Sequence, residues 1–106
     1  MWPGNIVKFD GYLPTYMDSY DKKVTPSQKV DKILNWLDLP TGKRPSFIAV
    51  YMSNVDVDGH EFGTESANLD KTIIEADETV GQIFEGLKKR NLTEIVNLII
   101  VTCKLI

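Results

Sequence analysis

An aspartate and a histidine four residues apart are the strongest chemical signal in this sequence. Asp56 and His60 flank Val-Asp-Gly in a short stretch that follows the apolar run 47–52. A carboxylate oxygen and an imidazole nitrogen are both zinc ligands, and a turn after a strand could direct both toward one ion. The spacing therefore indicates a metal site, although Asp and Gly are also common turn formers and would explain a purely structural turn.

The same region also fits the spacing of a calcium-binding loop. The residues at positions one, three, five, six and twelve of an EF-hand loop would be Asn54, Asp56, Asp58, Gly59 and Glu65. An EF-hand loop is entered from a helix, whereas residues 47–52 have the pattern of a strand. Asn54 is a weak first ligand, and Glu61 occupies a position that is usually apolar. These departures disfavour calcium.

Composition limits the kinds of partner. The chain has 106 residues, enough for one small domain, and 42% of them are hydrophobic and 25% charged. The net charge of -3 argues against a nucleic-acid partner, and the basic cluster 88–90 is typical of a helix C-terminus. Neither a membrane segment nor a signal peptide is expected. Cys103 is the only cysteine, so no disulfide is predicted.

The chain should divide into an irregular arm and a regular part. Residues 1–24 are rich in Gly, Pro, Tyr and Asp and show no sustained periodicity. A helix is predicted from Thr25, because Thr25 as N-cap, Pro26 and Gln28 form a capping box. Apolar residues then recur at helical spacing until the helix ends at Asp38-Leu39-Pro40.

Residues 25–106 are predicted to hold this helix and a βαβ unit, which makes the fold class α/β. The runs 47–52 and 95–101 are continuously apolar, as expected for strands covered on both faces. A long amphipathic segment, 66–90, predicts a helix between them. The two strands are therefore predicted to be parallel and to be joined by a right-handed crossover. The loop 56–63 and Thr102 should then lie at the same sheet edge, where α/β proteins bind ligands.

Several short motifs occur together in a specific order. The sequence resembles the ectonucleotide pyrophosphatase/phosphodiesterase family, the type I phosphodiesterases/nucleotide pyrophosphatases of the alkaline-phosphatase-like superfamily, and fungal members in particular. The resemblance covers nearly the whole chain. It is carried by Trp2-Pro3-Gly4, residues 33–40, Arg44-Pro45, Tyr51, Asp56, Gly59, His60, Gly63, Asn91-Leu92 and residues 97–101.

The resemblance implies an α/β sandwich with two zinc ions and a threonine nucleophile. Such enzymes hydrolyse nucleotide pyrophosphate and phosphodiester bonds to nucleoside 5′-monophosphates, so nucleotides are the implied partners. It also implies that Asp56 and His60 bind one of the two zinc ions. Family members are typically membrane-anchored with an extracellular or lumenal catalytic domain, or are secreted. In that setting Asn91, within Asn-Leu-Thr, is a candidate glycosylation site.

The sequence also departs from the family pattern. The family's nucleophile lies upstream of the Trp-Pro-Gly motif, and the family reads Ser-Asp-His-Gly-Met where this chain has Thr102-Cys103-Lys104-Leu105-Ile106. Lys104 thus replaces a ligand by a cation. We therefore expect an internal fragment of the catalytic domain, 1–106, from a truncated gene or an incorrect gene model, which is inactive alone. The alternative is a non-catalytic remnant with no independent function.

Overall fold

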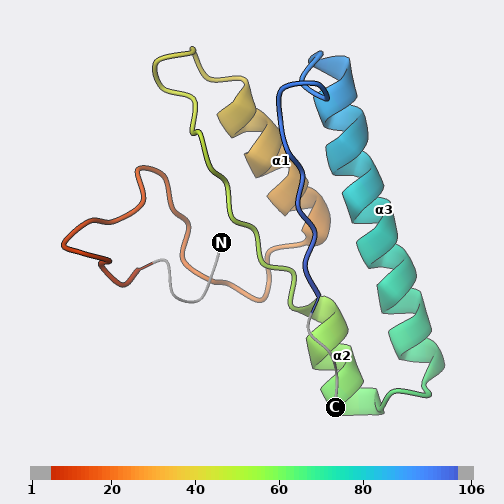
Figure 1. The fold of residues 1–106 in the computed structure, drawn as a ribbon. Helices are drawn as coiled ribbons and strands as arrows, with labels where there is room; N and C mark the ends of the chain where they lie inside the picture. Colours follow the sequence, from red (N-terminus) through yellow and green to blue (C-terminus); the bar gives the residue numbers. More distant parts are fainter. Residues whose placement is uncertain (1–5, 103–106) are drawn as a thin grey trace.

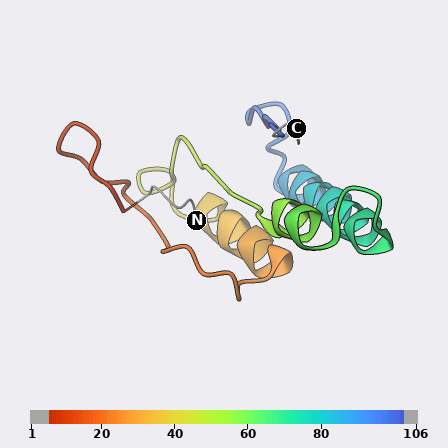
Figure 2. The same ribbon diagram turned by 90° about the horizontal axis from the view of Figure 1, so that it is seen from below.

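The computed structural model describes residues 6–102, in which three helices form the regular structure. The helices are α1 (Pro26–Leu37), α2 (Asn54–Phe62) and α3 (Ala67–Lys89). α1 and α3 lie side by side and run in the same direction, and α2 packs on the N-terminal part of α3 in the opposite direction (Figure 1). The arm, residues 6–24, lies on the side of α1 away from α3 (Figure 2).

α1 begins where the sequence predicts. The Thr25 hydroxyl accepts a hydrogen bond from the Gln28 backbone N–H at 3.2 Å, and the Gln28 side chain accepts one from the Thr25 N–H at 2.9 Å. This reciprocal pair is the capping box, and it satisfies two backbone donors that a helix N-terminus leaves free. Pro26 occupies the first turn, and Asp38 follows the last helical residue. The predicted helix is confirmed.

The hydrophobic core lies between α1 and the C-terminal half of α3. Its buried members are Val30, Ile33, Leu37, Ile83, Leu87 and Leu92. The predicted helix over 66–90 is present as α3, and its buried face includes polar as well as apolar side chains. Thr72 and Thr79 are buried, whereas Ile73 is 49% exposed. The Thr72 and Thr79 hydroxyls donate hydrogen bonds to backbone carbonyls of the preceding turn, which allows burial of these polar side chains.

Two contacts fix the C-terminal ends of α1 and α3 side by side. A Cβ placed on Gly86 of α3 would stand 2.5 Å from Leu34 Cδ2, so the glycine allows this close approach. The Arg90 guanidinium donates two hydrogen bonds of 2.6 Å to the Asp38 carboxylate and one of 3.0 Å to the Gly86 carbonyl. This bidentate pair connects the residues that follow the two helices.

The predicted βαβ unit is wrong, because residues 6–102 contain no strand and no sheet. Residues 47–53 and 95–101 run in the same direction toward α2 (Figure 1), but no backbone hydrogen bond joins them in the described part of the chain. In each segment some side chains pack on the core, among them Ile48 and Val96, while Phe47 and Ile99 are 85% and 81% exposed. An apolar run alone does not supply a neighbouring strand for its backbone donors and acceptors, and in the described part of the chain neither segment pairs with one.

Candidate metal centre

Asp56 and His60 lie on a helix rather than on the predicted loop after a strand. They stand one turn apart on α2, and Asp56 Oδ1 lies 3.4 Å from His60 Nε2. Both side chains face solvent, with exposed fractions of 51% and 75%. Residues four apart on a helix share one face, so the local helix itself brings the two groups together.

The helical position of this segment has identifiable causes. Asp56 lies in the first turn and His60 in the last, where each complements the helix dipole. The helix ends at Gly63, whose φ of 83° suits glycine and whose N–H donates to the Gly59 carbonyl. The sequence suggested a loop because Asp58-Gly59 is a common turn pair, and contacts with α3 outweigh this local preference.

The separation of the Asp56 and His60 side-chain atoms can be compared with that of two zinc ligands. Two ligands about 2.1 Å from a zinc at the tetrahedral angle stand about 3.4 Å apart. The observed distance between Asp56 Oδ1 and His60 Nε2 is also 3.4 Å. The same distance also fits an ordinary i,i+4 ion pair on a helix surface, which stabilises a helix by about 0.3–0.5 kcal/mol. The distance is therefore compatible both with two ligands of a tetrahedral site and with an ion pair on the helix surface.

Asp58 does not join this pair. Its carboxylate accepts a hydrogen bond from the Thr72 hydroxyl of α3, and so ties α2 to α3. Among the residues that the structure describes, no group of three or more His, Cys, Asp or Glu side chains could hold a metal ion. Residues 54–62 are helical, so they do not form the loop that the EF-hand spacing suggested. Lys104, at the position of a family ligand, lies outside the described residues.

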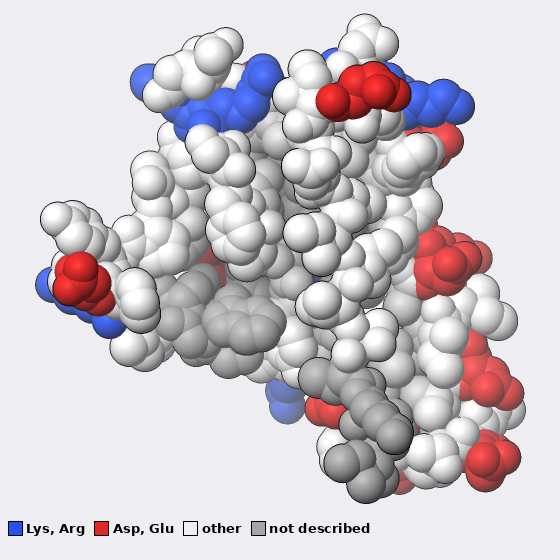
Figure 3. All heavy atoms as spheres, in the orientation of Figure 1, with Lys and Arg blue, Asp and Glu red and all other residues white. Residues whose placement is uncertain are grey.

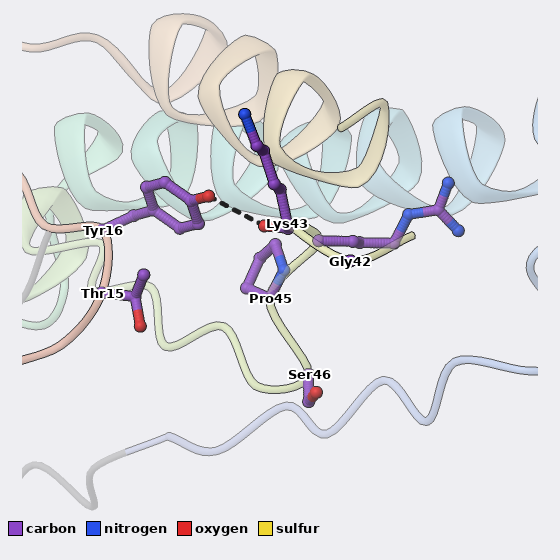
Figure 4. A pocket seen from close by; sticks show the side chains of 7 residues that line it. Thr15, Tyr16, Gly42, Lys43, Pro45 and Ser46 are labelled. Carbon is purple, nitrogen blue, oxygen red and sulfur yellow. Dashed lines mark hydrogen bonds between the residues drawn. The ribbon is translucent and has the colours of Figure 1, made fainter. Parts of the chain in front are cut away.

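One pocket of the described structure is remote in sequence from this pair. It has a volume of about 540 Å³ and lies between the arm and the turn after α1, lined by Thr15, Tyr16 and residues 42–46. The Tyr16 hydroxyl donates to the Lys43 carbonyl at 2.9 Å, and the Lys43 and Ser46 side chains extend to opposite sides of the turn (Figure 4). No sequence pattern indicates this pocket, because it joins segments 27 residues apart.

Figure 3 shows charged side chains at several places on this face, with an acidic group beside the basic groups at the end where α1 and α3 finish. Basic groups gather at the end where α1 and α3 finish, and acidic groups lie over α3. The exposed acidic residues of α3 are Asp70, Glu75, Asp77, Glu78 and Glu85. Over the described range, no helix combines the length and the apolar character needed to cross a membrane.

Asn91 is exposed and directly follows the end of α3. Its φ of 54° is left-handed, its N–H donates to the Lys88 carbonyl, and the Leu92 N–H donates to the Leu87 carbonyl. This pattern is a Schellman motif, in which asparagine is tolerated at the left-handed position. Asn91 therefore has a structural role at the end of α3, and its side chain is exposed.

Comparison with known proteins identifies the family. Residues 1–102 match the family model of type I phosphodiesterase / nucleotide pyrophosphatase. Over 99 residues, 93% of this chain, the sequence is 48% identical to an uncharacterized pyrophosphatase/phosphodiesterase of Schizosaccharomyces pombe and 44% identical to a venom phosphodiesterase of Crotalus durissus collilineatus. It is 38% identical to ectonucleotide pyrophosphatase/phosphodiesterase family member 3 of Bos taurus over the same length.

The matched region is a small part of each relative. It spans 20% of the Schizosaccharomyces pombe protein, 12% of the venom phosphodiesterase and 11% of the Bos taurus protein. The family model nevertheless covers nearly the whole chain, including the α1 motif and the Asp56–His60 pair. This chain therefore belongs to the type I phosphodiesterase / nucleotide pyrophosphatase family.

Proposed function

We propose that this chain supplies two zinc ligands, Asp56 and His60, to the active site of a nucleotide pyrophosphatase/phosphodiesterase. The observation that carries the proposal is the 3.4 Å separation of Asp56 Oδ1 and His60 Nε2 on one exposed helix face. Family membership supports the same chemistry. The substrates would be nucleotides with a pyrophosphate or phosphodiester bond, and the products nucleoside 5′-monophosphates.

The two side chains have distinct parts in this site. A bound zinc ion would polarise a phosphoryl oxygen and so favour attack on phosphorus. Asp56 would contribute one oxygen and His60 its Nε2. Because zinc sites use three or four protein ligands, further ligands would come from beyond the described residues. The exposure of both side chains leaves their outer face open to such partners.

A chimaeric enzyme tests this proposal. The matching segment of the Crotalus durissus collilineatus venom phosphodiesterase, 99 residues in length, is replaced by the corresponding residues of this chain. We expect the chimaera to hydrolyse a chromogenic nucleotide phosphodiester in the presence of zinc. His60→Ala and Asp56→Ala should each lower kcat/KM by about 100-fold or more, since each removes a metal ligand.

Two controls make the result specific. Glu61→Ala changes an exposed residue on the same helix and should leave kcat/KM near that of the chimaera. The 106-residue chain alone should show no hydrolysis, with or without zinc, because two ligands do not complete a site. An active chimaera that tolerates His60→Ala and Asp56→Ala would overturn the proposed role of the pair.

A further inference from the structure

We infer that Lys29 and Tyr20 are positioning residues for the Asp56–His60 pair, because they hold the backbone that enters α2 from two sides. The inference rests on the proposed function, since it concerns the orientation of the same pair. Lys29 comes from α1 and Tyr20 from the arm. Both act on residues 51–53, which directly precede α2.

Lys29 binds the entry segment from the α1 side. The residue is 2% exposed, and its Nζ donates a hydrogen bond of 2.8 Å to the Tyr51 carbonyl. Burial lowers the pKa of the Lys29 ammonium, and the neighbouring Tyr20 opposes this shift. A buried cation is costly, and an apolar side chain of similar length would fill the same space without that cost. Lys29 therefore contributes a directed hydrogen bond in addition to packing.

Tyr20 binds the same segment from the side of the arm. Its hydroxyl lies 3.0 Å from Ser53 Oγ, and Ser53 is 8% exposed. Ser53 is the N-cap residue of α2, yet its side chain makes no capping hydrogen bond. A serine at this position normally accepts a hydrogen bond from the first turn. Here the Ser53 hydroxyl pairs with Tyr20 instead, so it connects the arm to the residue that precedes α2 and does not cap the helix.

α2 also packs on the N-terminal part of α3. None of its residues, all of which the structure describes, is buried. The hydrogen bond from Thr72 to Asp58 holds its middle against α3. Because Asp56 lies in the first turn, a rotation of residues 51–53 would redirect both ligands without changing the distance between them. A metal site requires its ligands to be held within about 0.5 Å, so this entry segment, together with the contacts between α2 and α3, sets the direction in which the pair points.

Distance measurement between two spin labels on this chain tests the inference. Labels are attached to cysteines introduced by Asn35→Cys in α1 and Glu61→Cys in α2, both exposed, with Cys103→Ser to leave no other thiol. We expect a single narrow distance peak. Lys29→Met and Tyr20→Phe should each lose that narrow peak, whereas Lys29→Arg, which keeps a donor, should retain it.

Matched variants separate positioning from general destabilisation. Lys22→Met and Tyr12→Phe make the same chemical changes at exposed positions and should keep the narrow peak. Tyr20→Phe removes one hydroxyl only, so its cooperative unfolding should persist while the peak broadens. Lys29→Met and Tyr20→Phe variants that both retain the narrow peak would overturn the inference. This readout needs no zinc, so its failure is distinct from failure of the proposed function.

The chimaeric enzyme adds a catalytic readout. If the pair binds zinc, Tyr20→Phe should lower kcat of the chimaera with little change in KM, because the variant misplaces ligands without touching the substrate. Tyr12→Phe should leave both constants unchanged. An unchanged kcat in the Tyr20→Phe chimaera, together with loss of activity in His60→Ala, would retain the proposed function and reject the positioning role.

Discussion

The interface between α1 and α3 and the helix α2 are held in place by different means. The interface contains the apolar core and a bidentate Arg90–Asp38 pair. α2 has no buried residue among those described, and polar contacts to residues 51–53 and to Asp58 hold it. The free energy of folding therefore comes mainly from the interface, while the groups suited to metal chemistry lie where little apolar surface is buried.

The largest expected effect separates the two regions directly. Leu87 is 3% exposed in the core, so Leu87→Ala should lower the free energy of unfolding by about 2–5 kcal/mol through lost burial and a cavity. Val57 of α2 is 47% exposed, so Val57→Ala should change it by less than about 0.5 kcal/mol. Urea unfolding measures both. Equal losses would contradict the comparison.

Two glycines of α3 provide a sharper test of the interface. Gly86→Ala should lower the free energy of unfolding by about 1 kcal/mol, because the added methyl would meet Leu34 at 2.5 Å. At Gly81 no heavy atom lies within 4 Å of an added Cβ, so Gly81→Ala should raise it by about 0.5–1 kcal/mol through helix propensity. Thermal unfolding of both variants checks the signs. Stabilisation by both would show that Leu34 moves aside freely.

The stability of the interface between α1 and α3 should also depend on pH. The hydrogen bond from Arg90 holds the pKa of the Asp38 carboxyl below its ordinary value. Near the ordinary pKa of an aspartate, the unfolded state therefore binds more protons than the folded state. The stability contributed by the pair is present above this ordinary pKa and is lost as pH falls through the lowered pKa of Asp38. Asp38→Asn should reduce the fall in stability below about pH 4. Urea unfolding at a series of pH values measures this effect. If the free energy of unfolding of Asp38→Asn falls with decreasing pH as steeply as that of the parent, this role for the pair is contradicted.

The sequence predicted α1 and α3, but it predicted a loop in place of α2. The α1 capping box and the length of α3 depend on neighbouring residues, and both predictions agree with the structure. The strands failed because the runs 47–52 and 95–101 indicate burial but contain no information about a backbone partner. Buried Thr72 and Thr79 were missed because the hydroxyl bonds that permit their burial are absent from an apolar pattern.

The candidate site was only partly predictable for a similar reason. The four-residue spacing of Asp56 and His60 indicated a shared site on a turn after a strand, whereas both residues lie on α2. The partners of the entry segment come from residues 20 and 29, more than twenty positions away, and no local pattern connects them to residues 51–53. Hydrogen bonds over such separations depend on tertiary packing.

The central claim is that Asp56 and His60 bind one metal ion, and His60 reports on it without ambiguity because it is the only histidine in the chain. Zinc is titrated into the 106-residue chain while the imidazole resonances are followed by NMR. We predict a weak, saturable shift of the His60 signals, and at least about tenfold weaker binding in Asp56→Asn than in the parent. Asp58→Asn should bind as the parent does. Absence of a zinc-dependent shift, or equal affinity in Asp56→Asn and the parent, would contradict the claim.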